Sequence, residues 1–293
     1  MRFGCHLPAY GPAATRETVL GFARAVERLG YDSLWVSDHV VVPWTIASRY
    51  PYNKTGDFPL PPSTDFLEPL TLLSAVAGAT ERVALGTSVL VLPHRHPVLT
   101  AKIAATIDRL APGRLILGVG VGWMQEEIEL FGVPYRRRGA WSDEAIRVMR
   151  ACWAREERTS HAGEFFRFQD LGVFPKPARP IPIWVGGDTP AALRRVAALA
   201  DGWHAAFPTA EELGPALERL RGECARAGRD FSTLTLSARV GLAARRTADE
   251  LIAQLKALRD LGVHEVMLES ASRDLAQMTS IFERFAHDVR PRL

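Results

Sequence analysis

Residues 82–132, RVALGTSVLVLPHRHPVLTAKIAATIDRLAPGRLILGVGVGWMQEEIELFG, decide the fold that the sequence predicts. Two apolar segments, residues 83–92 and 114–119, are rich in Val, Leu and Ile, and a helical pattern over residues 97–110 lies between them. Strands without polar alternation are typical of a parallel sheet that helices cover on both faces. A strand, a crossover helix and a second parallel strand form one βαβ unit.

The same alternation of strand and helix runs along the whole chain. Apolar strand-like segments lie near residues 2, 33, 83, 115, 182, 203, 234 and 265, and a helical pattern follows each of them. Eight βα units in 293 residues are typical of a (β/α)8 TIM barrel. We therefore expect an α/β protein with one barrel domain over residues 1–293 and a short edge hairpin near residues 164–168. Two domains of ordinary size are the alternative.

The composition limits the classes of partner. The net charge is only +3, and no run of Lys and Arg is dense enough to indicate a nucleic-acid-binding surface. No apolar run approaches the roughly 20 residues of a membrane-spanning helix, and the first residues read as a strand and not as a signal peptide. Three cysteines without metal-type spacing are typical of a reducing compartment. We therefore expect a cytoplasmic protein that binds neither nucleic acid nor a membrane.

A long segment, residues 40–69, interrupts the regular alternation. It is rich in proline and contains Trp44, Tyr50, Tyr52 and Phe58. Long loops inside compact domains are usually lids or binding loops, and a disordered surface insertion is the alternative. Because aromatic side chains are uncommon in disordered segments, we expect a loop on the substrate side of the barrel.

Polar residues gather where the predicted strands end, which is where TIM barrels carry their active sites. Asp38 and His39 follow the second strand. A histidine titrates near neutral pH, so this pair could act as acid and base at the barrel mouth; a hydrogen-bonded structural histidine is the alternative. His94 and His96 share one turn, but no third ligand is evident, and we expect no metal site.

Two glycine-containing turns are candidates for binding a cofactor. Gly186, Gly187, Asp188 and Thr189 precede a helix, and a helix N-terminus preceded by glycines can bind a phosphate. A tight turn in which Asp188 or Thr189 caps the helix explains these residues equally well. The sequence GVGVG at residues 118–122 resembles a dinucleotide loop only superficially, and close packing of strand against helix is the better explanation.

Four segments together resemble the luciferase-like monooxygenase superfamily, and more closely its branch of coenzyme F420-dependent oxidoreductases. They are SDHVVVPW (residues 37–44), LGTSVLVLPHRHP (85–97), GRLILGVGVGWMQEE (113–127) and PIWVGGDTPAALRRVAALADGW (182–203). The resemblance covers nearly the whole chain in the family's order. It implies a TIM barrel, usually a homodimer, that holds a flavin or deazaflavin at the carboxyl ends of its strands.

The resemblance also assigns roles to individual residues. His39, beside Asp38, matches the family histidine near the reactive carbon, and Ser88–Val89 matches the position of a non-prolyl cis peptide that faces the middle ring of the cofactor. The residues expected to bind the cofactor are Ser88, Val89, Gly120, Gly122, Trp123, Gly186, Gly187, Asp188, Thr189 and Arg138. His6 and Trp44 are expected to contact the substrate.

Family members that oxidise sugar phosphates carry Thr and Glu where this chain has Val121 and Trp123. This departure argues against a sugar-phosphate substrate, and the tryptophans Trp44 and Trp123 favour a small apolar one. The expected function is hydride transfer between F420 and such a substrate, with His39 handling the proton. Two alternatives stay open: an FMN-dependent monooxygenase that uses oxygen, and a non-catalytic flavin-binding protein. A flavin or F420 reductase is the protein partner that would supply reduced cofactor.

Overall fold

The computed structural model describes residues 1–206, 209–242, 247–270, 272 and 274–293. The strands of its main sheet are β1 (Arg2–His6), β2 (Ser33–Val36), β3 (Ala84–Thr87), β4 (Leu90–Val91), β5 (Leu115–Gly120), β8 (Ile183–Gly186), β9 (Gly202–Ala205), β10 (Thr235–Leu242) and β11 (Glu265–Ser270). They pair in the order β3-β2-β1-β11-β10-β9-β8-β5-β4, and β3 also pairs with β5, which closes the sheet into a barrel. The predicted (β/α)8 TIM barrel is therefore confirmed.

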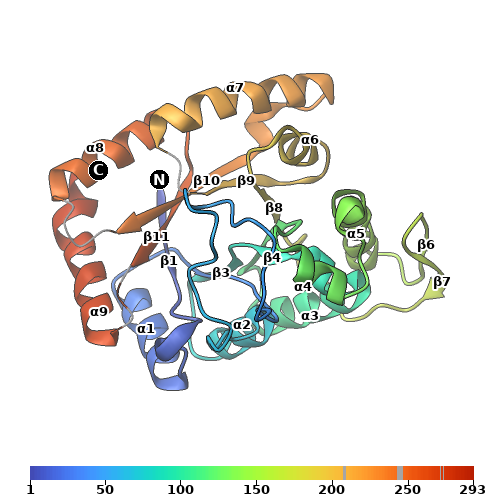
Figure 1. The fold of residues 1–293 in the computed structure, drawn as a ribbon, viewed down its shortest axis with the longest axis horizontal. Helices are drawn as coiled ribbons and strands as arrows, with labels where there is room; N and C mark the ends of the chain where they lie inside the picture. Colours follow the sequence, from blue (N-terminus) through green and yellow to red (C-terminus); the bar gives the residue numbers. More distant parts are fainter. Residues whose placement is uncertain (207–208, 243–246, 271, 273) are drawn as a thin grey trace.

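Helices surround the barrel (Figure 1). They are α1 (Arg16–Arg28), α2 (Pro69–Ala77), α3 (Pro97–Leu110), α4 (Gln125–Leu130), α5 (Arg138–Trp153), α6 (Pro190–Leu199), α7 (Ala210–Arg226), α8 (Ala248–Asp260) and α9 (Leu275–Arg284). In α1, the buried residues Val19, Phe22, Ala23 and Val26 follow the i, i+3, i+4, i+7 spacing of one helix face. No helix in the described part of the chain is long and apolar enough to cross a membrane.

The expectation of one continuous strand over residues 83–92 is wrong. The ladder is interrupted after Thr87, at a cis peptide bond between Ser88 and Val89. The two halves pair separately with β5, through Leu85 opposite Leu115 and Leu90 opposite Val119. The interruption lies at the carboxyl end of the barrel strands, where the resemblance places the cofactor.

The barrel interior contains a small apolar cluster, separate from the larger core between the strands and the helices. Trp35, Ile116, Trp184 and Met267 form it, and the rings of Trp35 and Trp184 lie 5.3 Å apart. A Cβ atom on Gly86 would lie only 2.3 Å from the Trp35 ring, so this glycine makes room for the tryptophan. The interior is therefore filled by side chains, as is usual for eight-stranded barrels.

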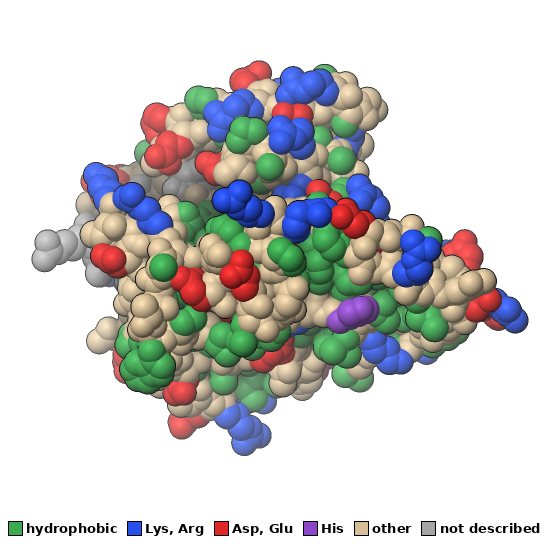
Figure 2. Space-filling view, turned by 45° about the vertical axis from the view of Figure 1, so that its right-hand side comes forward, with side chains coloured by type: hydrophobic (Ala, Val, Ile, Leu, Met, Phe, Trp, Pro, Cys, Tyr) green, Lys and Arg blue, Asp and Glu red, His purple; other side chains and the backbone are tan. Residues whose placement is uncertain are grey.

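A two-stranded antiparallel hairpin, β6 (Thr159–Ala162) and β7 (Arg167–Leu171), projects from the barrel beside α5 (Figure 1). In the space-filling view the surface of the molecule also protrudes on the right-hand side (Figure 2). The expected hairpin at residues 164–168 was misplaced, because the segment from Glu164 to Phe166 forms the turn between the strands. The Glu144 carboxylate of α5 accepts hydrogen bonds from the backbone N–H groups of these three residues, which holds the turn against that helix.

Candidate functional site

The segment between β2 and α2 crosses the carboxyl end of the barrel (Figure 1). Its aromatic side chains pack against one another and against the loop that follows β5. His39 lies 5.0 Å from Phe58 and 5.3 Å from Phe66 between ring centroids, and Tyr50 lies 5.1 Å from Trp123. The predicted substrate-side loop therefore covers the barrel mouth with an aromatic cluster, which we define as His39, Tyr50, Phe58, Phe66 and Trp123.

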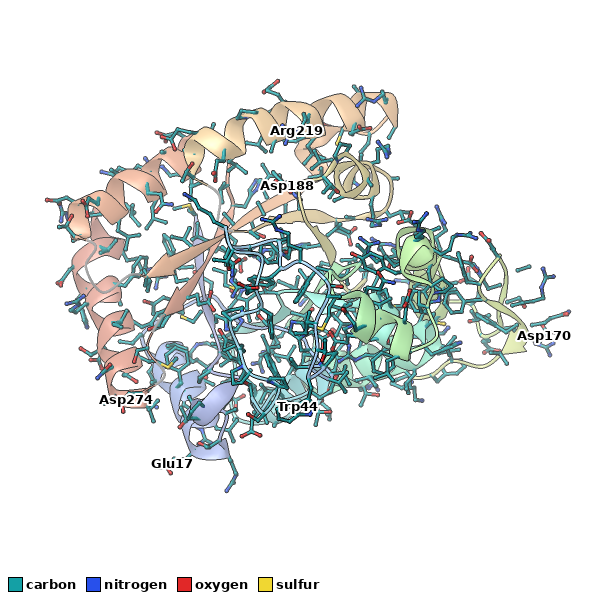
Figure 3. All side chains as sticks on the ribbon, viewed as in Figure 1. Glu17, Trp44, Asp170, Asp188, Arg219 and Asp274 are labelled. Atoms are coloured by element: carbon teal, nitrogen blue, oxygen red, sulfur yellow. The ribbon has the colours of Figure 1, made fainter. Side chains whose placement is uncertain are left out.

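Trp44, which the sequence suggested as a substrate contact, lies outside the aromatic cluster. Its side chain is 85% exposed, and it lies toward the lower side of the molecule in the view of Figure 3. Because an exposed side chain excludes no water from a substrate, its position gives no support to the expected role. The apolar face at the mouth comes instead from Trp123, in the loop after β5, and from the rings of the segment between β2 and α2.

His39 is held by a buried carboxylate. Its Nδ1 lies 2.8 Å from Oε2 of Glu127, a residue of α4 whose side chain is 1% exposed. The same carboxylate accepts hydrogen bonds from the backbone N–H groups of Val40 and Val41, at 2.7 and 3.1 Å. Burial raises the pKa of Glu127, but the hydrogen bond from His39 and the other donors outweigh it and bring the pKa below the usual 4.5. Glu127 is therefore ionised at neutral pH.

The expected acid–base pair of Asp38 with His39 is not formed. Asp38 accepts two hydrogen bonds from the guanidinium of Arg95, at 2.6 and 2.8 Å, and a third from the backbone N–H of Val91 at 2.9 Å. The planar fork of an arginine matches both oxygens of a carboxylate. The two neighbouring side chains thus have different partners, and Asp38 serves to fix the start of β4 beside the Ser88–Val89 peptide.

A second histidine lies behind His39. Nε2 of His94 is 3.5 Å from Oε2 of Glu127, and its Nδ1 is 3.9 Å from Oδ2 of Asp38. The pKa of His94 is lowered, because the effect of burial outweighs that of the two carboxylates, which act to raise it. His96 points elsewhere and accepts a hydrogen bond from the backbone N–H of Val98 at the start of α3. No group of His, Cys, Asp and Glu within the described residues is arranged to hold a metal ion.

The Ser88–Val89 peptide is cis, as the resemblance predicts. The Ser88 hydroxyl points into the barrel, 2.8 Å from Nε2 of His204, and Nδ1 of His204 lies 2.6 Å from the Ser237 hydroxyl. Burial, together with the charge of Arg239, lowers the pKa of His204 to about 3. His204 is therefore neutral, and it supports the peptide from inside the barrel.

His6, the other suggested substrate contact, is also part of this support. Its side chain is buried, and Nε2 lies 2.8 Å from the hydroxyl of Ser37. That hydroxyl donates a hydrogen bond to the carbonyl oxygen of Ser88 at 3.3 Å. The structure therefore places His6 behind the Ser88–Val89 peptide and not at an open surface of the mouth.

The loop after β5 lies beside the same peptide. A Cβ atom on Gly120 would lie 2.6 Å from a methyl group of Val89, so the glycine allows Val89 to pack closely. Arg138, an expected phosphate contact, donates to the carbonyl oxygen of Gly122 at 3.1 Å and lies over the Tyr135 ring. The Tyr135 hydroxyl donates to the carbonyl oxygen of Trp123 at 3.0 Å. In the structure Arg138 therefore stabilises the loop after β5 through its contacts with Gly122 and Tyr135.

The turn after β8 forms the capped tight turn that the sequence offered as one of two interpretations. Gly187 has a positive φ of 94°, and its carbonyl oxygen accepts a hydrogen bond from the Trp203 indole at 2.7 Å. The Thr189 hydroxyl accepts from the Ala192 N–H at 3.2 Å and caps α6, which confirms the capping role. Asp188 is exposed beside the barrel mouth (Figure 3), and Gly186 would place a Cβ atom 3.0 Å from Val89.

The residue that the sequence did not reveal is Glu127. In the sequence it is one of three glutamates in the segment MQEEIEL, and nothing distinguishes it from the other two. Its burial next to Ile128 is known only from the structure, and a fully buried charged residue usually has a partner. The partner, His39, is 88 residues away, and only the closed order of β2, β3 and β5 brings the two together.

Comparison with known proteins identifies the family of this chain. Residues 1–290 match the family described as luciferase-like monooxygenase. An uncharacterized protein of Mycobacterium tuberculosis is 36% identical over 214 residues, which make up 73% of this chain and 74% of that protein. An F420-dependent glucose-6-phosphate dehydrogenase of Nakamurella multipartita is 33% identical over 242 residues, 80% of this chain and 65% of that protein.

Two solved structures share the fold. An F420-dependent secondary alcohol dehydrogenase in complex with an F420–acetone adduct has a TM-score of 0.80 at 18% identity, over 99% of this chain and 98% of that chain. The oxygenating constituent of 3,6-diketocamphane monooxygenase of Pseudomonas putida, in complex with FMN, has a TM-score of 0.75 at 16% identity, over 100% and 98%. Because the family match spans almost the full chain, this protein belongs to the luciferase-like monooxygenase family.

Proposed function

We propose that this protein is a coenzyme F420-dependent oxidoreductase that transfers a hydride between the deazaflavin and a small, mainly apolar organic substrate. The observation that carries the proposal is the His39–Glu127 pair at the barrel mouth, surrounded by aromatic rings. The choice of F420 is supported by the Nakamurella relative, which is F420-dependent, and by the fold shared with an F420-dependent alcohol dehydrogenase.

The residues at the mouth fit a planar cofactor with a charged tail. Val89 packs directly against the backbone of Gly120 and Gly186, which have no side chains to obstruct the space above them. Ser88, Val89 and the loop of Gly120, Gly122 and Trp123 would hold the ring. The start of α6, at residues 187–189, would hold the phosphate, because free N–H groups and the helix dipole favour an anion there.

The proposed chemistry assigns the proton to His39. When bound, the deazaflavin supplies a two-electron hydride carrier. In the oxidising direction, Nε2 of His39 accepts the hydroxyl proton of an alcohol substrate, and in the reducing direction the imidazolium returns it to the carbonyl oxygen. The aromatic cluster excludes water from this proton, since Phe58 and Phe66 both lie against the imidazole.

The substrate we propose is not a sugar phosphate, although one relative is a glucose-6-phosphate dehydrogenase. By the resemblance described above, Trp123 stands where the sugar-phosphate enzymes carry an acidic residue. Its ring lies 5.4 Å from Phe58 and 5.1 Å from Tyr50, so an apolar surface stands where those enzymes have a carboxylate. An apolar alcohol or carbonyl compound suits this surface better than a phosphorylated sugar.

The second candidate is an FMN-dependent monooxygenase that receives reduced flavin from a reductase. The shared fold of the FMN-bound diketocamphane monooxygenase favours it. The two candidates differ in their use of oxygen, because a deazaflavin reacts poorly with it. A non-catalytic flavin-binding protein would instead bind cofactor without turning over any acceptor.

Titration of the purified apo-protein with F420 and, separately, with FMN tests the proposal. We expect micromolar or tighter binding of F420, followed by fluorescence, and much weaker binding of FMN. The reverse order of affinities, together with oxygen consumption in the presence of reduced FMN, would favour the monooxygenase. Failure to bind either cofactor would refute both.

A further inference from the structure

The Glu127 carboxylate is surrounded by hydrogen-bond donors. Nδ1 of His39 lies at 2.8 Å and the N–H groups of Val40 and Val41 lie at 2.7 and 3.1 Å. Nε2 of His94 lies farther away, at an ion-pair distance of 3.5 Å. The carboxylate is 1% exposed, so these protein groups replace water around it. An ionised carboxylate can only accept hydrogen bonds. Every group that hydrogen-bonds to it must therefore present a hydrogen.

This requirement decides which nitrogen of His39 carries the proton. In a neutral imidazole one ring nitrogen is a donor and the other an acceptor. Nδ1 faces the carboxylate, so Nδ1 carries the hydrogen and the lone pair lies on Nε2. Within the described residues, Nε2 of His39 has no hydrogen-bonding partner. It is the nitrogen that is left to meet a bound molecule.

We infer that Glu127 is a positioning residue that fixes His39 as the Nδ1–H tautomer and reserves Nε2 for proton exchange with the substrate. The tautomer follows from the contacts alone, whereas the proton exchange rests on the proposed function. Glu127 acts through His39 and touches no reacting atom. A buried carboxylate in this role orients the imidazole and stabilises its charged form.

The same helix also holds the insertion. Glu127 binds the first two N–H groups after His39, while its neighbour Glu126 binds a second point of the segment. Glu126 accepts hydrogen bonds from the N–H groups of Ala47 and Ser48, at 2.6 and 3.0 Å, and from the Ser48 hydroxyl at 2.7 Å. Glu126 has no contact with His39 in the described structure. It is therefore a matched control on the same helix for effects of the insertion.

The substitution Glu127→Gln removes the interaction that orients the His39 imidazole and leaves the packing around residue 127 nearly unchanged. The amide has nearly the size of the carboxylate, and its oxygen can still accept from Val40 and Val41. Its NH₂ group would then face Nδ1 of His39, and two donors cannot bond to each other. We expect His39 to change to the Nε2–H tautomer in this variant and to keep the Nδ1–H tautomer in Glu126→Gln.

The tautomer is measured by nitrogen–proton correlation NMR of protein labelled at histidine, at a pH where imidazoles are neutral, with His39→Ala to assign the signal. Wild-type protein should show Nδ1–H at His39. An Nε2–H signal in the wild type would overturn the inference without recourse to any variant. A persistent Nδ1–H signal in a folded Glu127→Gln protein would overturn it as well.

Enzyme activity then tests the second part of the inference, that Nε2 of His39 exchanges a proton with the substrate. With F420 and an accepted substrate, Glu127→Gln should lower kcat by about 100-fold or more, the usual contribution of a positioned acid–base group, with KM little changed. Glu126→Gln should keep a kcat near that of the wild type. Equal losses in both variants would show that Glu127 acts only by holding the insertion. If the tautomers behave as expected but F420 does not bind, the proposed function fails and the assignment of Glu127 stands.

Discussion

Replacing Arg95 with methionine removes the cation that faces a fully buried carboxylate. Arg95 binds both oxygens of Asp38, at 2.6 and 2.8 Å, and also binds Glu68 at 2.9 Å. The side chain of Asp38 is 0% exposed and that of Arg95 is 11% exposed. Removal of one partner from a buried pair leaves an uncompensated charge and costs about 3–5 kcal/mol. We expect Arg95→Met to lower the free energy of unfolding by that amount.

The measurement is denaturant-induced unfolding followed by circular dichroism, with Arg292→Met as the control. Arg292 pairs with Asp249 at a similar 2.6 Å, but the two side chains are 55% and 81% exposed. An exposed pair contributes at most about 1 kcal/mol. The double variant Asp38→Asn, Arg95→Met should recover part of the loss, because no charge is left unpaired. Stability of Arg95→Met within about 1 kcal/mol of the wild type would refute the assigned role of the pair.

Three further predictions concern the mouth. His39→Ala should bind the cofactor with unchanged affinity and lose turnover by about 100-fold; full activity would remove His39 from the mechanism. Gly120→Ala would place a Cβ atom 2.6 Å from Val89, so the displaced Val89 should weaken F420 binding by about tenfold in a fluorescence titration. Folding lowers the pKa of Glu127 below 4.5, so its stabilisation is present above that pH and is lost in acid. The stability gap between wild type and Glu127→Gln should therefore narrow toward pH 3 in unfolding experiments.

The barrel could be predicted from the sequence because its signals are local. Runs such as residues 115–119 are apolar without alternation, and helices such as Pro97–Leu110 begin at proline and end before the turn of Pro112 and Gly113. Neither signal requires knowledge of distant residues. The interruption at Ser88 was visible only by resemblance, since ALGTSVLVL carries no residue that ends a strand by itself.

The site was less predictable because its contacts join distant segments. Asp38 and His39 are adjacent in sequence, and proximity favoured a pair between them. Their partners, Arg95 and Glu127, come from other βα units and approach only when the barrel closes. Trp44 was favoured by its residue type, yet the side chains that cover the mouth are Tyr50, Phe58 and Phe66. Which aromatic residue of a long insertion faces inward depends on the path of the loop, and periodicity does not record that path.

His204 and His39 stand in opposite electrostatic surroundings. His204 lies inside the barrel between two serine hydroxyls, and burial with the nearby charge of Arg239 keeps it neutral. His39 lies at the mouth with an ionised carboxylate at Nδ1. Of the two, only His39 hydrogen-bonds to an ionised carboxylate and keeps a ring nitrogen without a partner among the described residues. Under the proposed function, His39 is therefore the histidine that meets the substrate, while His204 supports the peptide.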